Sequence, residues 1–198
     1  MVVIGLTGGI ASGKSTVSSY LQERGIPLLD ADAVAYELSV PEGPVWHLFV
    51  EHFGHQILAA DGTLRRDAVA QRVFGNAKEK SWLDAGTHPL IQEVLQARIE
   101  RYREAGAALV VLDIPLLFET GWDQLVDAVW VVYVDAATQL QRLRQRDAYD
   151  EETARRRIAA QMSLEEKKQR ADVIIDNNGL PEEARLQVDA ALAQYVTD

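Results

Sequence analysis

The chain of 198 residues has no cysteine, which excludes a disulfide framework and a thiolate metal site. Long hydrophobic runs are missing too, because stretches such as 128–134 are far shorter than the roughly 20 residues that span a membrane. No basic segment followed by an apolar signal stretch stands at the N-terminus, so we expect no secretion signal. These absences predict a cytoplasmic enzyme without a transmembrane helix.

Positive charge is scarce: 20 Lys and Arg residues stand against 30 Asp and Glu residues, for a net charge of −10. A chain with this balance repels phosphate backbones, so we expect no nucleic acid partner. Nine of the 20 basic residues nevertheless lie between Arg142 and Arg170. This segment is either a solvated helical face or a clamp for phosphate groups.

What the chain does contain is enough apolar material, 47% of its residues, to fill one core. Its length is typical of one domain with insertions rather than of two independent domains.

A glycine-rich segment follows the first apolar run, residues 2–8. The pattern Gly-x-x-x-x-Gly-Lys-Ser, from Gly8 to Ser15, predicts a strand, a phosphate-binding loop and a helix. Inward-facing N–H groups and the N-terminal end of the helix dipole both attract an anion there. A purely structural glycine turn is the alternative interpretation. We expect ATP to be bound by this loop and the first helical turn, at Gly8, Gly9, Ala11, Ser12, Gly13, Lys14, Ser15 and Thr16.

Two residues of the loop have separate chemical roles in this interpretation. Lys14 reaches the β- and γ-phosphate oxygens as a point charge, and the hydroxyl of Ser15 is a direct ligand of Mg²⁺. Asp113 ends the apolar run 109–114, which we interpret as a strand buried on both faces. Its carboxylate is then placed to hold Mg²⁺ through a water molecule.

A second pair of acids, Asp30 and Asp32, ends the predicted strand at residues 26–30. Ligands of open α/β sheets gather at the carboxyl ends of the strands, where the phosphate loop also lies. Either acid is a candidate cap for a helix starting near Ala33. Either is also a candidate to orient an acceptor hydroxyl and take its proton.

The middle of the chain, residues 33–106, has helical periodicity broken by turn signals, the last of them at residues 87–89. We interpret it as a helical insertion that builds the acceptor pocket. His88 and Pro89 are expected at a helix start, where His88 either caps or packs the helix or contacts the substrate. The four histidines lack the spacing of metal ligands.

The basic segment is predicted to form helices of a lid. Asp135 or Thr138 caps a first helix that carries Arg142 and Arg146 on one face, and Asp150 caps a second with Arg157 as a less secure candidate. Ser163 begins a capping box for a third. Such a lid excludes water during phosphoryl transfer.

The last predicted strand covers residues 172–176 and leads into a turn at Asn178 that we expect to border the adenine of ATP. Pro181 then opens a closing helix with apolar positions that include Val188 and Val196.

The collected motifs resemble those of the dephospho-CoA kinase family along essentially the whole chain. They are Gly5-Leu6-Thr7-Gly8-Gly9-Ile10, Asp30-Ala31-Asp32, His88-Pro89, Pro115-Leu116-Leu117-Phe118-Glu119, Gln139 with Arg142 and Arg146, and Asp176-Asn177-Asn178-Gly179. The resemblance implies transfer of the ATP γ-phosphate to the ribose 3′-hydroxyl of dephospho-CoA, the last step of coenzyme A biosynthesis, with Mg²⁺ as cofactor. It implies Asp32 as catalytic base, with Lys14 and Arg142 assisting, and His88 beside the substrate.

The same resemblance implies a three-layer α/β P-loop kinase fold in which helices flank a central parallel sheet. Residues 1–30, 106–137 and 171–198 would form the nucleotide-binding core, 31–105 a helical CoA domain and 138–170 the lid. One departure is Ala11, where the family pattern has glycine; a methyl group is tolerable there if the backbone keeps φ negative. ATP and dephospho-CoA are the implied partners of a monomer or small homo-oligomer. The alternative is another small P-loop kinase, acting on a nucleoside monophosphate or small metabolite, and the absence of an Asn-Lys-x-Asp motif argues against a nucleotide-dependent switch.

Overall fold

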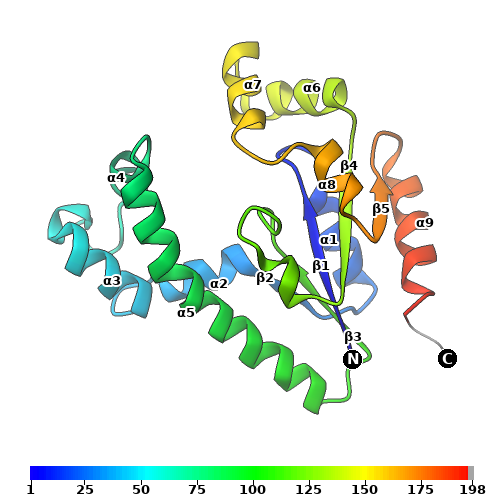
Figure 1. Cartoon of the computed structure of the whole chain (residues 1–198), viewed down its shortest axis with the longest axis horizontal. Coiled ribbons are helices and arrows are strands. Elements are labelled where there is room, and N and C mark those ends of the chain that lie inside the picture. Colours follow the sequence, from blue (N-terminus) through cyan, green and yellow to red (C-terminus); the bar gives the residue numbers. More distant parts are fainter. Residues whose placement is uncertain (196–198) are drawn as a thin grey trace. The chain divides into compact units, whose positions relative to one another are not determined.

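The sheet of the protein, seen in a computed structural model that describes residues 1–195, has the strand order β2-β3-β1-β4-β5 (Figure 1). The strands are β1 (Val2–Gly8), β2 (Leu28–Asp30), β3 (Leu109–Asp113), β4 (Ala128–Tyr133) and β5 (Val173–Asp176). β1 pairs in parallel with β3 and β4, and β4 pairs in parallel with β5. Every residue of β3 and β4 is buried, as apolar parallel strands require. The predicted α/β architecture with a central parallel sheet is confirmed.

One face of this sheet is covered by α1 (Lys14–Glu23) and α9 (Pro181–Leu192). Leu21 of α1, Val188 of α9 and Trp130 of β4 belong to the same core cluster, and each is completely buried. Burying a large apolar side chain contributes roughly 1.5–3 kcal/mol, so this layer fixes α1 and the loop before it. The predicted start of the closing helix at Pro181 is confirmed, whereas Val196 lies outside the described residues.

Three helices lie between β4 and β5, and the short 3-10 helix η2 (Trp122–Leu125) precedes β4. They are α6 (Ala136–Asp147), α7 (Glu151–Ala159) and α8 (Leu164–Gln169), and α6 leaves the end of β4 directly (Figure 1). Asp135 caps α6 by accepting from the Thr138 N–H, Asp150 caps α7 in the same way, and Ser163 forms the predicted capping box. Each start was readable from the sequence because a cap is a local interaction.

Residues 30–100 form a second compact unit, while residues 1–29 and 101 onward form the first. The second unit contains α2 (Ala31–Leu38), α3 (Pro44–Phe53), the 3-10 helix η1 (His55–Ile57), α4 (Arg66–Val73) and most of α5 (Ala77–Glu104). Its own apolar cluster is built from residues of α3, η1 and α4, among them Phe49, Ile57 and Val69. The expected helical insertion therefore has a core of its own.

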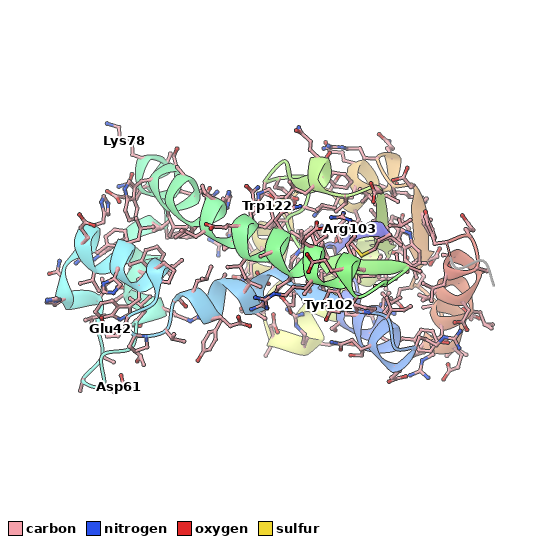
Figure 2. All side chains as sticks on the ribbon, turned by 90° about the horizontal axis from the view of Figure 1, so that it is seen from below. Glu42, Asp61, Lys78, Tyr102, Arg103 and Trp122 are labelled. Carbon is pink, nitrogen blue, oxygen red and sulfur yellow. The ribbon has the colours of Figure 1, made fainter. Side chains whose placement is uncertain are left out.

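The expectation that His88 and Pro89 begin a helix is wrong, because α5 runs without a break from Ala77 to Glu104. Figure 2 shows Lys78 near one end of this helix and Tyr102 and Arg103 near the other. Proline removes one backbone donor and is therefore a common stop signal. Here the helix continues because Ile91, Leu95 and Ile99 are buried at helical spacing beyond it.

Candidate functional site

The phosphate loop between β1 and α1 surrounds a cavity of about 450 Å³. Its peptide bonds are trans, and φ is +86° at Gly13 and +60° at Ala11. The condition of a negative φ at Ala11 is therefore not met, and this alanine adopts a left-handed φ that a Cβ atom disfavours. The residues that line the cavity come from the loop and the start of α1, from the segment after β3, from α6, and from the turn between α7 and α8. They are Gly8, Gly9, Ile10, Ala11, Gly13, Lys14, Ser15, Pro115, Arg142, Arg146 and Gln161.

The first turn of α1 presents its N–H groups toward this loop. Gly13 occupies the N-cap position and no side chain caps the helix. Free N–H groups and the positive end of the dipole make such a terminus an anion site. Ser15 and Thr16 of this turn are exposed, and the hydroxyl of Ser15 is at the cavity wall.

Lys14 forms an ion pair with Asp113, whose side chain is almost fully buried at the end of β3. The second carboxylate oxygen of Asp113 accepts a hydrogen bond from the Ser18 hydroxyl. The pairing lowers the cost of burying the acid and holds the ammonium group beside the loop. A carboxylate has about four lone-pair sites, so Asp113 retains capacity to accept from a water molecule as well.

Two arginines of α6 reach the same cavity. Arg142 and Arg146 both line it, as their spacing of four residues predicts. Arg146 also donates from Nε and Nη2 to the Asp147 carboxylate at 2.8 and 2.9 Å, which raises the pKa of Arg146. Arg157 instead stacks over the Tyr149 ring at 4.6 Å and is not part of the cavity wall.

Amide side chains hold the phosphate loop through its backbone N–H and C=O groups. Gln139 Nε2 donates to the Ile10 carbonyl oxygen at 2.9 Å, Gln161 Oε1 accepts from the Ile10 N–H at 2.8 Å, and Asn177 Nδ2 donates to the Ser12 carbonyl oxygen at 2.8 Å. Sequence reasoning did not identify Gln161 or Asn177 individually, because these contacts join residues more than 150 positions apart. The one sequence feature that could have pointed to Asn177 is the motif Asp176-Asn177-Asn178-Gly179.

Asn178, the predicted neighbour of adenine, is used in the turn after β5. Its Oδ1 accepts from the Asp135 N–H at 3.0 Å and its Nδ2 donates to Asp176 at 2.9 Å. It is not among the residues that line the phosphate cavity. Its role toward ATP stays a prediction.

Lys167 of α8 is completely buried behind the loop. Its Nζ donates to the carbonyl oxygens of Gly8 at 3.3 Å and Pro115 at 2.9 Å, and it pairs with Glu119 at 3.0 Å. Burial lowers the pKa of Lys167, while Glu119 acts in the opposite direction. Sequence analysis placed this lysine only within a basic segment.

α8 is joined to the sheet by one further hydrogen bond, from the Tyr133 hydroxyl to the Glu165 carboxylate. This bond raises the pKa of Tyr133 to about 12. The contact anchors α8 to the end of β4.

The predicted acceptor-side residues belong to the second unit. Asp30 is the cap of α2, since its Oδ1 accepts from the N–H groups of Asp32 and Ala33 at 2.8 and 3.0 Å. The helix therefore starts at Ala31, two residues before the expected position, and Asp32 is exposed in its first turn. His88 lies 3.7 Å from Asp84, and burial lowers its pKa.

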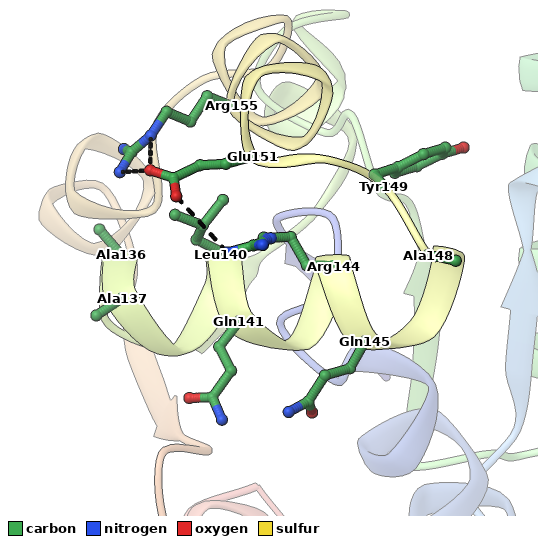
Figure 3. Close-up of a pocket in the computed structure, with 10 residues that line it drawn as sticks. All are labelled: Ala136, Ala137, Leu140, Gln141, Arg144, Gln145, Ala148, Tyr149, Glu151 and Arg155. Atoms are coloured by element: carbon green, nitrogen blue, oxygen red, sulfur yellow. Dashed lines mark hydrogen bonds and ion pairs between the residues drawn. The ribbon is translucent and has the colours of Figure 1, made fainter.

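A larger hollow, of about 810 Å³, lies between α6 and α7 and shares no lining residue with the phosphate cavity. Figure 3 shows Glu151 at its upper side, bonded to Arg155 and paired with Arg144 at 3.6 Å. Gln141 and Gln145 project from the other side of α6 (Figure 3). This hollow therefore presents charges that are already paired.

Within residues 1–195, no helix is long and apolar enough to cross a membrane. The same part of the chain contains no group of three or more His, Cys, Asp or Glu side chains arranged to hold a metal ion. A metal at this site would therefore take most of its ligands from the nucleotide and water, as Mg²⁺ does in phosphate sites.

Comparisons with known proteins converge on one family. The family model described as dephospho-CoA kinase matches residues 2–183. The dephospho-CoA kinase of Symbiobacterium thermophilum is 49% identical over 96% of this chain and 80% of its own length, and that of Shouchella clausii is 47% identical over 96% and 97%. The crystal structure of TT1252 from Thermus thermophilus superimposes with a TM-score of 0.84, at 32% identity over 99% of this chain and 98% of that one.

Proposed function

The chain belongs to the dephospho-CoA kinase family, and from that premise we propose how its residues share the transfer of the ATP γ-phosphoryl group to dephospho-CoA. The protein is an ATP-dependent kinase. The acceptor atom in this proposal is the ribose 3′-oxygen, and the products are CoA and ADP. The observation that carries the proposal is the convergence of the phosphate loop, Lys14 and two lid arginines on one cavity.

On the donor side, N–H groups of the loop and the first turn of α1 bind the phosphates. Lys14 neutralises charge on the β- and γ-phosphates, and Arg142 and Arg146 grip phosphate oxygens from the lid. These groups are held in place before the reaction, so they stabilise the developing charge with little reorganisation. Asn178 borders the adenine, and Ser12 and Thr16 complete the ATP-binding loop.

The oxygen donors near the cavity suit Mg²⁺. Ser15, which lines the cavity, would supply a hydroxyl oxygen as direct ligand, and Asp113, at the end of β3, would accept a hydrogen bond from a water molecule of the ion. When bound, the ion neutralises charge on the β- and γ-phosphate oxygens. The chain's own contribution is to hold these two oxygen donors next to Lys14.

On the acceptor side, Asp32 orients the 3′-hydroxyl and takes its proton, and His88 contacts the substrate. Asp30 supports this assignment indirectly, because its carboxylate is committed to the N–H groups at the start of α2. In this proposal Asp32 is therefore the catalytic base. General base assistance of this kind contributes typically about 10²–10⁴-fold to a rate.

The functional parts in this proposal are a nucleotide-binding core (residues 1–30, 106–137 and 171–198), a CoA domain (31–105) and a lid (138–170). Closure of the lid excludes water from the γ-phosphate. ATP and dephospho-CoA are the partners in the cytoplasm, and the protein acts as a monomer or small homo-oligomer.

The experiment that tests the substrate assignment is a coupled assay of ADP release with four acceptors: dephospho-CoA, AMP, CMP and UMP. We expect acceptor-dependent turnover with dephospho-CoA alone. Equal or faster turnover with a nucleoside monophosphate would instead support the alternative small P-loop kinase.

A further inference from the structure

Two buried amides contact the phosphate loop at alternate carbonyl groups. Gln139 donates to Ile10 and Asn177 donates to Ser12, at 2.9 and 2.8 Å. Only 5% of Gln139 and 6% of Asn177 is exposed. Because both partners are carbonyl oxygens, the NH₂ group of each amide faces the loop. The two side chains come from different elements, α6 and the turn after β5.

The glycines of the loop provide the space for these amides. A Cβ atom on Gly13 would lie 2.1 Å from Asn177 Nδ2, and a Cβ atom on Gly9 would lie 2.7 Å from Gln139 Nε2. Real Cβ atoms do not approach so closely. Absence of a side chain at Gly9 and Gly13 therefore serves the approach of two protein amides as well as the approach of a ligand.

The two hydrogen bonds determine which way the loop N–H groups point. In a trans peptide the C=O and N–H bonds point in opposite directions. The carbonyls of Ile10 and Ser12 are turned toward Gln139 and Asn177, so the N–H groups of Ala11 and Gly13 point away from these amides. Both Ala11 and Gly13 line the phosphate cavity. The orientation of the Ala11 and Gly13 N–H groups toward an anion in the cavity is therefore set by the amides on the opposite side of the loop.

We propose that Gln139 and Asn177 are positioning residues for ATP: they hold two peptide planes of the phosphate loop so that the Ala11 and Gly13 N–H groups face the phosphates. This proposal rests on the proposed function only in taking the loop as the ATP phosphate site. The proposal goes beyond the proposed function because Gln139 and Asn177 act on the nucleotide only indirectly, through the backbone of the loop. Gln139 belongs to a lid helix, so it also links the lid to the shape of the loop.

The test replaces each amide by an apolar side chain of similar length, in Gln139→Met and Asn177→Leu. The matched control is Gln141→Met on the same helix, because Gln141 is exposed in the outer hollow between α6 and α7. Titration calorimetry measures the affinity for ATP and for inorganic tripolyphosphate, which has no adenine. Thermal melting and steady-state kinetics are recorded on the same preparations.

We expect Gln139→Met and Asn177→Leu each to weaken tripolyphosphate and ATP by about five- to tenfold, the effect of one hydrogen bond. The KM for ATP should rise in proportion, while the KM for dephospho-CoA and the affinities of Gln141→Met stay unchanged. A lowered melting temperature with unchanged tripolyphosphate affinity in the folded variants would overturn the proposal and leave a purely structural role. If either variant fails to fold, Gln139→Ala and Asn177→Ala, which remove the donor without adding a charge, decide between the same outcomes. Tripolyphosphate binding does not depend on the acceptor, so it is separable from a failure of the substrate assignment.

Discussion

Ala11 has a backbone conformation that its side chain disfavours. Its φ of +60° is left-handed, where a Cβ atom costs roughly 1–2 kcal/mol. Neighbouring Gly13, at +86°, has the same handedness without that cost. The loop retains its shape because the backbone N–H and C=O of the adjacent Ile10 are both hydrogen-bonded, the N–H to Gln161 and the C=O to Gln139.

The first prediction follows from this strain. Ala11→Gly should raise the free energy of unfolding by about 0.5–1 kcal/mol, because relief of the left-handed strain exceeds the added entropy of the unfolded chain. The control is Ala97→Gly, at an exposed position inside α5, which should lower it by about 1 kcal/mol. Urea unfolding measures both. Destabilisation by Ala11→Gly would mean that the φ of residue 11 is negative in solution.

Lys167 and Glu119 form a pair that differs from the surface ion pairs of this protein. Lys167 is completely buried and the side chain of Glu119 is 22% exposed. Glu119→Gln leaves the lysine charge without its counter-charge, so we expect the free energy of unfolding to fall by about 2–3 kcal/mol, near the low end for a broken buried pair. Glu151→Gln breaks an exposed pair with Arg155 and should cost below about 1 kcal/mol. Similar costs for the two variants in urea unfolding would contradict this distinction.

At the scale of elements, α5 is the clearest departure from the sequence pattern. Pro89 removes the N–H that would bind the carbonyl of residue 85, yet the helix continues. Close packing holds this part of the helix: a Cβ atom on Gly86 would lie 2.7 Å from Leu48 of α3. Tertiary contacts of the helical unit thus override a local stop signal.

Restoring the missing donor should therefore stabilise α5. Pro89→Ala is expected to raise the free energy of unfolding by about 1–3 kcal/mol, the range for proline in a helix interior. Pro44→Ala is the control, because Pro44 occupies the first position of α3, where proline fits, and should change stability by about 0.5 kcal/mol at most. A neutral or destabilising Pro89→Ala, measured by urea unfolding, would show that proline at this position is needed for packing.

The arginines of α6 lie in two different surroundings. Arg142 lines the phosphate cavity, whereas Arg144 lines the outer hollow and pairs with Glu151 at 3.6 Å. Arg142→Ala should raise the KM for ATP or lower kcat by about tenfold or more, since a hydrogen bond to a charged group is worth about 1.5–3 kcal/mol. Arg144→Ala should leave both constants within about twofold. An unchanged Arg142→Ala enzyme would reduce that arginine to a surface charge.

At the scale of the whole molecule, the sequence was informative where structure is local. The strand, loop and helix around Lys14, the caps at Asp135 and Asp150 and the capping box at Ser163 are set by neighbouring residues, and all are confirmed. The parallel sheet followed from its buried apolar strands. These features depend on periodicity and short motifs.

What the sequence did not reveal depends on contacts between distant segments. Asn177 can donate its hydrogen bond to Ser12, and Lys167 can be buried, only when β5, α8 and the loop have come together. The φ of Ala11 is imposed by the same surroundings. The continuity of α5 was mispredicted because packing outweighed the local signal, whereas Asp30, one of the two candidate caps near the start of α2, is its cap.

Asp32 is the residue on which the proposed acceptor chemistry depends. Lys14 and the α6 arginines Arg142 and Arg146 belong to the unit with the sheet, and Asp32 and His88 to the helical unit. The donor side alone would describe many ATP-binding proteins.

The most direct measurement is a single-turnover assay of phosphoryl transfer from ATP to dephospho-CoA by Asp32→Asn, with ATP affinity determined in parallel. We expect transfer to be slower by about 10²–10⁴-fold, the contribution of a general base, at an ATP affinity equal to that of the unmodified protein. Near-normal transfer by Asp32→Asn would contradict the assignment of Asp32 as the base.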